Sequence, residues 1–445
     1  MLHKLKQFVP EPLLAIYHLV LAKLAVVVYG APANDMIVIG VTGTNGKSST
    51  VNFIAQLLTA LGQTVGYTST AGFNVAGTDI VNAMKMTMPG RFALQSLLRR
   101  MVKSGCKYAI VETSSQGIMQ HRHLGINYDV AVFTNLTPEH IEAHGGFENY
   151  KKAKGRLFAH LSAKQHKMID GRKVLKTIVV NADDEHATYF AGFTADKLLE
   201  FGWTEQRVMS QIKVQEQFQG TELSVDDLGA NVVIASVPAR LNLAAKFERL
   251  NALAAIATVT GLGFALTDVL VAAESLHGVT GRYQRIEAGQ PFSVVVDYAY
   301  EPYALLALLA AVKQAGAERI IGVHGSAGGG RDVARRPLIG KLAGEEESIV
   351  IVTNEDPYDE DPVTIMQAVA EGAVAAGKVM QKNLFIIEDR QQAIDKAIAL
   401  AEPGDTVIIT GKGSEPVMAV ADGKKIPWSD AEAAFKALAK IGYTV

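Results

Sequence analysis

A glycine-rich stretch between residues 40 and 50 carries the residue types that bind nucleotide phosphates. It reads Gly40-Val41-Thr42-Gly43-Thr44-Asn45-Gly46-Lys47-Ser48-Ser49-Thr50. Glycines let backbone N–H groups converge on phosphate oxygens, a lysine such as Lys47 reaches the terminal phosphates, and a serine such as Ser48 binds Mg²⁺. The stretch therefore predicts a phosphate loop for ATP or a relative, although Val41 stands where the general pattern has its first glycine.

The residues on either side of this loop predict the elements that must position it. Residues 36–40 (MIVIG) form a short apolar run typical of a buried strand, and residues 51–61 have the apolar spacing of a helix. A strand, a glycine-rich turn and a helix in this order are the context that supports phosphate binding. The loop alone does not separate motors, transporters, kinases and ligases.

The alternation of strand and helix patterns continues along the chain and predicts an α/β fold with mostly parallel sheets. Further apolar runs occupy residues 108–111, 130–133 and 177–180, and a second series occupies 293–296, 319–323, 348–352, 384–387 and 406–409. We expect a central ATP-binding domain with a phosphate loop over residues 36–282. A Rossmann-like C-terminal α/β domain is expected over residues 283–445.

Composition and charge limit the classes of partner. The chain has 445 residues, with 43 Lys and Arg against 45 Asp and Glu, so its net charge of −2 offers no cationic field for polyanions. Nucleic acid is therefore excluded as the expected partner. Cys106 is the one cysteine, which rules out an internal disulfide and a zinc site of several thiolates and favours the cytoplasm.

Residues 1–35 are expected to form a separate N-terminal apolar helical segment. Residues 13–29 (LLAIYHLVLAKLAVVVY) are almost continuously apolar, but His18 and Lys23 interrupt them. A span needs about 20 apolar residues, and a central cation costs roughly 2.5–3.5 kcal/mol on insertion. A buried or interfacial helix is the first interpretation and a membrane anchor is the second, so we expect a cytoplasmic protein with membrane contact left open.

Several ordered motifs resemble those of the Mur ligases, the ATP-dependent amide-forming enzymes of peptidoglycan synthesis. The loop T-G-T-N-G-K-S-S is similar to the ATP loop of that family. The further matches, in chain order, are Glu112-Thr113-Ser114-Ser115-Gln116-Gly117 with Gln120-His121-Arg122, Phe133-Thr134-Asn135-Leu136-Thr137-Pro138-Glu139-His140, Tyr150-Lys151-Lys152-Ala153-Lys154, Gly281-Arg282, Asp297-Tyr298-Ala299, Arg331-Asp332 with Arg336-Pro337, and Gly411-Lys412-Gly413-Ser414-Glu415. The later matches resemble the MurE branch.

The resemblance implies an acid–amino-acid ligase that forms ADP and works through an acyl phosphate. A MurE-type enzyme adds an amino acid, commonly meso-diaminopimelate or L-lysine, to the D-Glu of UDP-MurNAc-L-Ala-D-Glu. Its expected partners are this muramyl peptide and the amino acid, and we expect a monomer. The alternative is a related ligase of the same fold that acts on a lipid-linked or folate-type carboxylate donor.

The resemblance also implies roles for individual residues. Lys47, Arg282 and Mg²⁺ would neutralise the anionic reactants. Two Mg²⁺ ions are expected, held by Ser48, Glu112, His140 and, if it is carbamylated, Lys154. Lys47, Lys154, His140, Glu112 and Arg282 form the expected catalytic set. The expected ATP-binding residues are Gly43, Thr44, Asn45, Gly46, Lys47, Ser48, Ser49, Asn251, Arg282 and Asp297, and the expected substrate-binding residues are Thr87, Ser114, Gln120, Arg122, Arg331, Asp356, Gly411 and Glu415.

Three departures from the MurE pattern bear on the substrates. About forty residues precede the phosphate loop, whereas MurE proteins carry a whole UDP-binding domain there, so the donor must be held in another way. The D-N-P-R motif is replaced by Glu355-Asp356-Pro357-Tyr358, which removes a guanidinium partner for a distal carboxylate and makes lysine or another diamino acid plausible. Tyr300 and Ser414 replace two histidines, which indicates altered specificity more than lost chemistry.

Two further classes stay open at this point. A non-catalytic nucleotide-binding protein anchored by its first helix would bind ATP without turnover. A mechanical or transport ATPase would hydrolyse ATP without a carboxylate acceptor. The complete set of Lys47 and metal ligands argues against a dead site.

Overall fold

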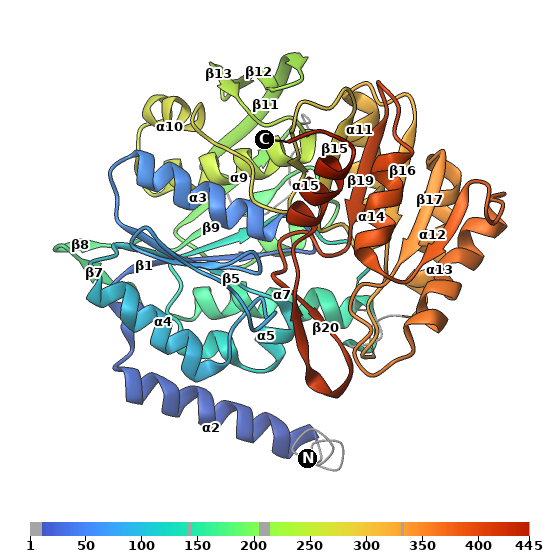
Figure 1. The fold of residues 1–445 in the computed structure, drawn as a ribbon. Coiled ribbons are helices and arrows are strands. Elements are labelled where there is room, and N and C mark those ends of the chain that lie inside the picture. The colour runs from blue at the N-terminus through green and yellow to red at the C-terminus, as the bar shows by residue number, and fades with distance from the viewer. Residues whose placement is uncertain (1–10, 140–143, 204–213, 331–332, 445) are drawn as a thin grey trace. The chain divides into compact units, whose positions relative to one another are not determined.

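A computed structural model describes residues 11–139, 144–203, 214–330 and 333–444 (Figure 1). The described chain forms two compact units. The first comprises the residues up to Pro138, those from His144 to Leu243, and Glu248–Leu276. The second comprises Glu139, Ala244–Phe247 and the residues from His277 onward.

One mixed sheet is the centre of the first unit. Within the described residues it has eleven strands in the order β13-β12-β11-β10-β9-β6-β1-β5-β2-β3-β4. The strands from β11 to β2 run parallel, and antiparallel strands extend both edges. The strands are β1 (Ile37–Thr42), β2 (Val65–Thr68), β3 (Phe73–Val75), β4 (Thr78–Ile80), β5 (Tyr108–Glu112), β6 (Val130–Phe133), β9 (Thr177–Asn181), β10 (Lys197–Gly202), β11 (Glu216–Asp226), β12 (Gly229–Ile234) and β13 (Val237–Leu241). A small hairpin joins β7 (Met168–Ile169) and β8 (Arg172–Lys173).

Helices cover both faces of this sheet, as the continuous apolar runs of its parallel strands require. Figure 1 shows α3, α9 and α10 on one face and α4, α5 and α7 on the other. Their bounds are α3 (Lys47–Ala60), α4 (Arg91–Lys103), α5 (Ser115–Met119), α7 (Phe147–Ser162), α9 (Lys246–Gly261) and α10 (Leu266–Ala273). Shorter helices are η1 (Pro32–Asn34), η2 (Arg122–Gly125) and α8 (Ala187–Ala191).

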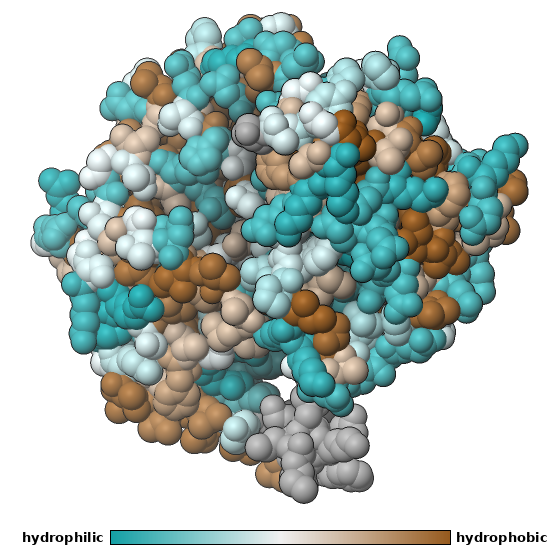
Figure 2. Space-filling model, viewed as in Figure 1, coloured by the Kyte–Doolittle hydropathy of each residue, from teal (hydrophilic) through white to brown (hydrophobic). Residues whose placement is uncertain are grey.

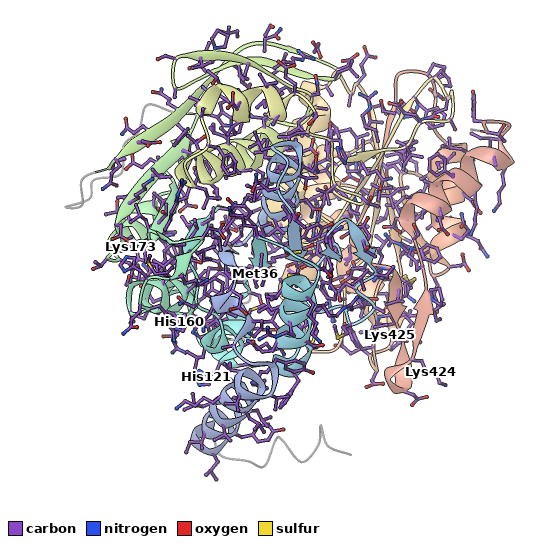
Figure 3. All side chains as sticks on the ribbon, turned by 90° about the vertical axis from the view of Figure 1, so that its left-hand side faces the viewer. Met36, His121, His160, Lys173, Lys424 and Lys425 are labelled. Atoms are coloured by element: carbon purple, nitrogen blue, oxygen red, sulfur yellow. The ribbon has the colours of Figure 1, made fainter. Side chains whose placement is uncertain are left out.

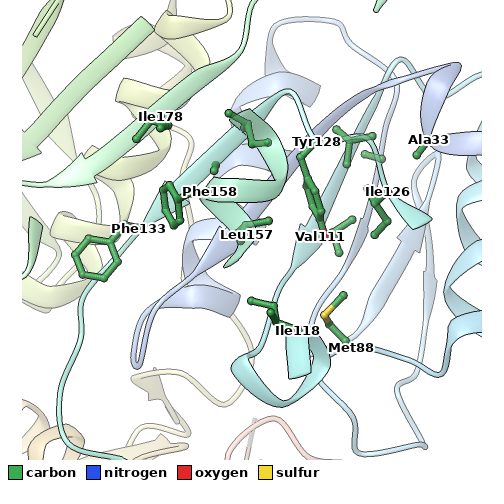
Figure 4. Packing of buried hydrophobic residues seen from close by; sticks show 14 of the residues in the cluster. Ala33, Met88, Val111, Ile118, Ile126, Tyr128, Phe133, Leu157, Phe158 and Ile178 are labelled. Carbon is green, nitrogen blue, oxygen red and sulfur yellow. The ribbon is translucent and has the colours of Figure 1, made fainter. Parts of the chain in front are cut away.

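A hydrophobic core beneath α7 packs against β1, the strand that leads into the phosphate loop. Tyr128, Leu157 and Phe158 are fully buried there, and Figure 4 shows their side chains packed between α7 and the sheet. Phe133, at the end of β6, stacks on Phe190 with ring centroids 3.9 Å apart. This packing fixes the carboxyl ends of β1 and β6, from which the site residues project.

The second unit contains a six-stranded sheet in the order β14-β15-β19-β16-β17-β18, counted over the described residues. The strands are parallel except for β14. They are β14 (Gln284–Arg285), β15 (Ser293–Asp297), β16 (Ile320–His324), β17 (Ile349–Thr353), β18 (Leu384–Ile387) and β19 (Thr406–Thr410), and a hairpin joins β20 (Val417–Ala419) to β21 (Lys425–Pro427).

Alternate residues of these strands enter two separate cores, as the two-residue period of a strand requires. Val295 and Val350 pack in the core that includes residues of α11, α12 and α13, whereas Val294 and Ile351 pack in the core of α14 and α15. The helices are α11 (Pro302–Gln314), α12 (Arg335–Glu346), α13 (Pro362–Ala375), α14 (Arg390–Ala399), α15 (Asp430–Lys440) and the short η3 (Ala421–Gly423). The predicted α/β fold with a second, Rossmann-like sheet is confirmed.

The N-terminal apolar run forms α2 (Glu11–Tyr29), which packs on α4 of the first unit. Ala22 and Ala25 are buried against the protein, but large side chains such as Val20 and Val27 are exposed. Helix α2, expected to be buried or interfacial, is thus buried on one face and exposed on the other. Within the described residues, no helix combines the length and apolarity needed to cross a membrane.

Candidate functional site

The phosphate loop lies between the end of β1 and the start of α3, and two of its glycines leave no room for a side chain. Gly46 has φ +79°, and a Cβ there would lie 2.2 Å from Oδ1 of Asn251. A Cβ on Gly43 would lie 1.9 Å from Oγ1 of Thr134. The predicted ATP residue Asn251 thus lies against the loop, and both positions require glycine because neighbouring side chains occupy the space of a Cβ.

The segment after β6 fixes the conformation of this loop. The amide of Asn45 donates to Oδ1 of Asn135 (2.8 Å), and the carbonyl of Asn45 accepts from Nδ2 of Asn135 (3.1 Å) and Oγ1 of Thr134 (2.7 Å). The amide of Thr44 donates to the carbonyl of Asn135 at 2.8 Å. Thr134 and Asn135 belong to a motif that the sequence analysis recognised, but their role as supports of the loop was not predicted.

Three predicted ATP-binding residues, Lys47, Ser48 and Ser49, lie in the first turn of α3. The ammonium of Lys47 donates to the carbonyl of Thr44, and Ser48 and Ser49 are buried in the same turn. The first N–H groups of a helix have no partner within the helix and favour an anion. The loop and this helix start therefore suit a polyphosphate.

Glu112 connects the nucleotide loop to the predicted donor residues. Its carboxylate lies at the end of β5, is 1% exposed, and accepts from Oγ of Ser48 at 2.9 Å and from the amide of Thr70 at 2.7 Å. The hydroxyl of Thr70 lies 3.1 Å from Oε1 of Glu112 and 2.9 Å from Oγ1 of Thr87. Three predicted residues thus form one chain through Thr70, which the sequence analysis missed because nothing in its local pattern distinguishes it.

The oxygen atoms of Ser48 and Glu112 fit a magnesium ion, because Mg²⁺ binds hydroxyl and carboxylate oxygens together with phosphate and water. Over the residues that the structure describes, no group of three or more His, Cys, Asp or Glu side chains forms a metal cluster. His140, the third expected ligand, lies outside the described residues. The oxygens of Ser48 and Glu112 are thus of the kind that a magnesium ion uses together with those of a nucleotide.

Lys154 lies beneath the loop on α7 and is 2% exposed. Its ammonium donates to the carbonyl of Gly43 at 2.6 Å and lies 4.4 Å from the centre of the Tyr150 ring. The hydroxyl of Tyr150 in turn lies 3.2 Å from Oγ1 of Thr44. The structure therefore places Lys154 in contact with the phosphate loop, whereas Lys152 on the same helix is exposed.

The remaining donor residues of the first unit gather around α5. Ser114 begins this helix and accepts from the amide of Gly117 at 3.2 Å. Nη2 of Arg122 donates to Oε1 of Gln120 at 2.6 Å, and Nη2 of Arg91 donates to the carbonyl of Gln120 at 2.6 Å. Burial, followed by the charge of Arg91, lowers the pKa of Arg122 to about 10.

These two guanidinium groups have unused hydrogen-bonding capacity. Nε of Arg91 and Nε of Arg122 are both buried without a hydrogen-bond partner. A buried N–H group without a partner costs about 1–3 kcal/mol, and guanidinium groups bind anions through charge-assisted hydrogen bonds. The two guanidinium groups therefore suit a carboxylate or phosphate group of the muramyl substrate.

In the second unit, Asp297 organises the residues around Arg282. Its carboxylate accepts from the amides of Tyr283 (2.6 Å) and Ala299 (2.7 Å), and burial raises its pKa. The guanidinium of Arg282 lies over the ring of Tyr298, 4.1 Å from its centre. The charge of Arg282 also acts on the Asp297 carboxylate, so the two predicted residues lie near each other.

Three predicted substrate-binding residues of the second unit, Asp356, Gly411 and Glu415, lie around Lys412. This fully buried lysine donates to Asp356 (2.9 Å) and Glu415 (2.6 Å), and Asp356 also accepts from the amide of Ala419. A Cβ on Gly411 would lie 2.4 Å from Oε2 of Glu355. Asp356 and Glu415 therefore neutralise an internal cation.

Glu355 differs from its acidic neighbours. It is 4% exposed, and its Oε2 is buried without a hydrogen-bond partner. Burial, followed by the charge of Asp356, raises its pKa. Glu360 is held by Arg336 at 2.7 Å, and Asp361 caps α13. The predicted substrate residue Arg331 lies outside the described residues.

Comparisons with known proteins give one consistent result. Residues 41–259 match the model of the Mur ligase middle domain, and residues 281–413 match that of the Mur ligase glutamate ligase domain. A UDP-N-acetylmuramyl-tripeptide synthetase of Roseiflexus sp. (strain RS-1) is 38% identical over 442 residues, which cover 98% of this chain and 85% of that protein.

Two more similar proteins have names that describe diaminopimelate ligases. A UDP-N-acetylmuramoyl-L-alanyl-D-glutamate–2,6-diaminopimelate ligase of Halalkalibacterium halodurans is 34% identical, over 89% of this chain and 77% of that protein. A solved structure of a ligase with the same name aligns with a TM-score of 0.59 and 28% identity, over 92% of this chain and 80% of that one.

Proposed function

This chain belongs to the Mur ligase family, and we propose that it catalyses a MurE-type step of peptidoglycan precursor synthesis. In this step ATP drives the addition of an amino acid to the D-Glu of UDP-MurNAc-L-Ala-D-Glu, with ADP and phosphate as the other products. The observation that carries the proposal is the contact chain from Ser48 through Glu112 and Thr70 to Thr87. It joins the nucleotide loop to the predicted donor site within one unit.

The chemistry requires that a carboxylate attack the γ-phosphate of ATP. An oxygen of the donor carboxylate bonds to phosphorus and ADP leaves, which gives an acyl phosphate. The amine of the amino acid then attacks the acyl carbon, loses a proton and displaces phosphate. Both reactants are anions, so Lys47 and the start of α3 are proposed to offset their repulsion.

We propose two Mg²⁺ ions at this site, which supply charge neutralisation when they are bound. Ser48 would hold the ion on the nucleotide side, and Glu112 and His140 would hold the ion that faces the donor. Lys154 would join the second set of ligands as a carbamate, formed when its neutral amine bonds to the carbon of CO₂ and loses a proton. Its burial beside the phosphate loop supports this assignment, because a carbamate there would supply an oxygen ligand near the bound nucleotide.

Carbamylation can be tested apart from activity. A sample equilibrated with ¹³C-bicarbonate is expected to show a carbamate carbon resonance that is absent in Lys154→Ala and unchanged in Lys152→Ala. A spectrum without that resonance in the wild-type protein would remove the carbamate from the proposed ligand set.

The paired guanidinium groups of Arg91 and Arg122 are proposed to hold an anionic group of the muramyl donor. Arg122→Gln removes one charge-assisted contact of about 1.5–3 kcal/mol, so we expect the KM for the donor to rise roughly 10- to 100-fold. The value of kcat should change little, since Arg122 does not touch the phosphate loop in the described contacts. Steady-state kinetics with the exposed Arg172→Gln as control measure this, and an unchanged KM would contradict the assignment.

The amino acid is proposed to be L-lysine or another diamino monocarboxylic acid. Tyr358 stands where the diaminopimelate motif has arginine, and the distal carboxylate of diaminopimelate would lack that partner. The buried carboxylate of Glu355, which has an unpaired oxygen beside Gly411, supports a cationic rather than an anionic side chain.

The experiment is a measurement of ATP-dependent phosphate release with product masses. UDP-MurNAc-L-Ala-D-Glu is combined in turn with L-lysine, ornithine, meso-diaminopimelate and glutamate, and a lipid-linked donor serves as a second arm. Release that requires both the UDP-linked donor and lysine or ornithine is the expected result. Release with the UDP-linked donor and diaminopimelate, but not with lysine or ornithine, would overturn the amino-acid assignment. No release when the UDP-linked donor is combined with any of the four amino acids would overturn the MurE-type reaction.

We propose further that the enzyme acts as a monomer in the cytoplasm. Light scattering of the purified protein at micromolar concentration tests the monomer.

A further inference from the structure

The outward face of α2 is a continuous apolar surface. Its large side chains have exposed fractions between 48% for Leu24 and 77% for Val27. Figure 2 shows this surface as a brown band over the helix, at the lower left of the molecule. The outward face consists of Leu13, Ile16, Tyr17, Val20, Leu24, Val27 and Val28.

The helix that carries this face is firmly attached to the first unit. Ala22 and Ala25 are buried, and α2 contacts both α4 and η2, the turn that follows His121 (Figure 3). Arg99 holds the C-terminal end, since its guanidinium donates to the carbonyls of Tyr29 at 2.7 Å and Gly30 at 2.6 Å. The small residues thus face the protein, and the large apolar ones are held away from it.

A helix that is apolar on all sides is normally covered on all sides. Moving one large aliphatic side chain out of water contributes about 1.5–3 kcal/mol, so the outward face can drive an association. The outward face of α2 is therefore expected to be covered by another surface.

The pattern of the face argues against a second helix as its cover. Leu13, Tyr17, Val20, Leu24 and Val27 follow the four-three spacing of a coiled-coil seam. The flanking positions of such a seam usually carry paired Glu and Lys, which set the partner and its orientation. Here Ile16 and Val28 occupy flanking positions. Lys23 occupies another, but no flanking position carries an acidic residue that could pair with it in a second copy of the helix. The result is a broad face without pairing charges.

The charges around α2 favour an anionic cover. Helix α4, on which α2 packs, carries no acidic residue, and its Arg100 and Lys103 are exposed. Lys23 is exposed on α2 itself, and the sequence before the helix adds Lys4 and Lys6 without an acidic residue. Each basic residue near an anionic bilayer contributes about 1 kcal/mol of attraction.

We propose that α2 docks this protein on the surface of a bilayer that contains anionic lipids. The helix lies in the plane of the interface, and its outward face enters the region between headgroups and acyl chains, as amphipathic interfacial helices do. The polar side of such a helix is here replaced by the protein body. This role is separate from the ligase site, because none of the outward-face residues belongs to the contacts around the phosphate loop.

Flotation of the whole purified protein with vesicles tests the proposal. Wild-type protein should float with vesicles of 70% phosphatidylcholine and 30% phosphatidylglycerol, and less with phosphatidylcholine alone. The double variant Val20→Glu with Leu24→Glu should bind the anionic vesicles at least tenfold more weakly. Val27→Lys, which adds a cation, should also bind more weakly, because apolar contact is lost. Val271→Glu, at a residue of α10 that is 70% exposed, should bind like wild type.

Ligase activity without vesicles should be the same in all these proteins, which shows that each variant is folded. Wild-type protein that stays in solution with both kinds of vesicle would overturn the proposal, as would equal flotation of the double variant. A wild-type dimer in light scattering that the double variant abolishes would show instead that a second copy of the chain covers α2.

Discussion

The Gly46→Ala variant is expected to lose tight ATP binding while it remains folded. The added Cβ would lie 2.2 Å from Oδ1 of Asn251, so the loop or Asn251 must move. The residue also has φ +79°, where an L side chain costs about 1–2 kcal/mol. Because the amides of this loop are proposed to bind phosphates, we expect the Kd for Mg·ATP to rise about 100-fold or more.

Gly62→Ala is the matched control for this variant. Gly62 follows the end of α3, has φ +74°, and a Cβ there meets no atom within 4 Å. It carries the same backbone strain without the collision, so calorimetry of the two variants separates strain from the loss of the phosphate cradle. Equal ATP affinity of Gly46→Ala and wild type would contradict the placement of ATP at this loop.

The second large effect is expected for Lys154→Ala. This residue is buried under the phosphate loop, and its ammonium donates to the carbonyl of Gly43. Removing one preorganised charged group from a reaction site typically costs about 10²–10³ in kcat, and the loss of the proposed metal ligand adds to that. We therefore expect a decrease in kcat of about 10³-fold or more.

Lys152→Ala, on the exposed side of the same helix, should retain normal kcat and KM. Thermal unfolding of both variants shows whether the fold is kept, since Lys154 also fills space in the core. A folded Lys154→Ala protein with kcat within tenfold of wild type would remove Lys154 from the reaction.

The sheets were predictable from the sequence because apolar runs of parallel strands are long and bounded by polar turns. The run at residues 130–133 coincides with β6, and that at 384–387 coincides with β18. The run at residues 36–40 was predicted one residue too early and two too short, since Val41 and Thr42 continue β1 into the loop.

The contacts that support the phosphate loop could not be predicted from local sequence patterns. Thr70 and Asn135 lie in loops, where no periodicity indicates orientation, and their contacts with Glu112 and Asn45 depend on how distant strands meet. The pairing of Asp356 with Lys412 crosses 56 positions of the chain. A local sequence pattern contains no information on such a partner.

The sequence predicts a buried or interfacial helix for α2, but it could not show which residues face outward, for a related reason. An apolar run predicts burial, but not by what. Only the structure shows that the alanines face α4 while the larger residues face outward.

Transfer of oxygen from the donor to phosphate tests the central claim most directly. UDP-MurNAc-L-Ala-D-Glu labelled with ¹⁸O in the γ-carboxylate of D-Glu is incubated with Mg·ATP, the enzyme and the accepted amino acid. If the carboxylate is activated as an acyl phosphate, each phosphate released carries one ¹⁸O atom, and the new amide retains the other. Phosphate without ¹⁸O, formed together with the amide product, would contradict carboxylate activation by ATP.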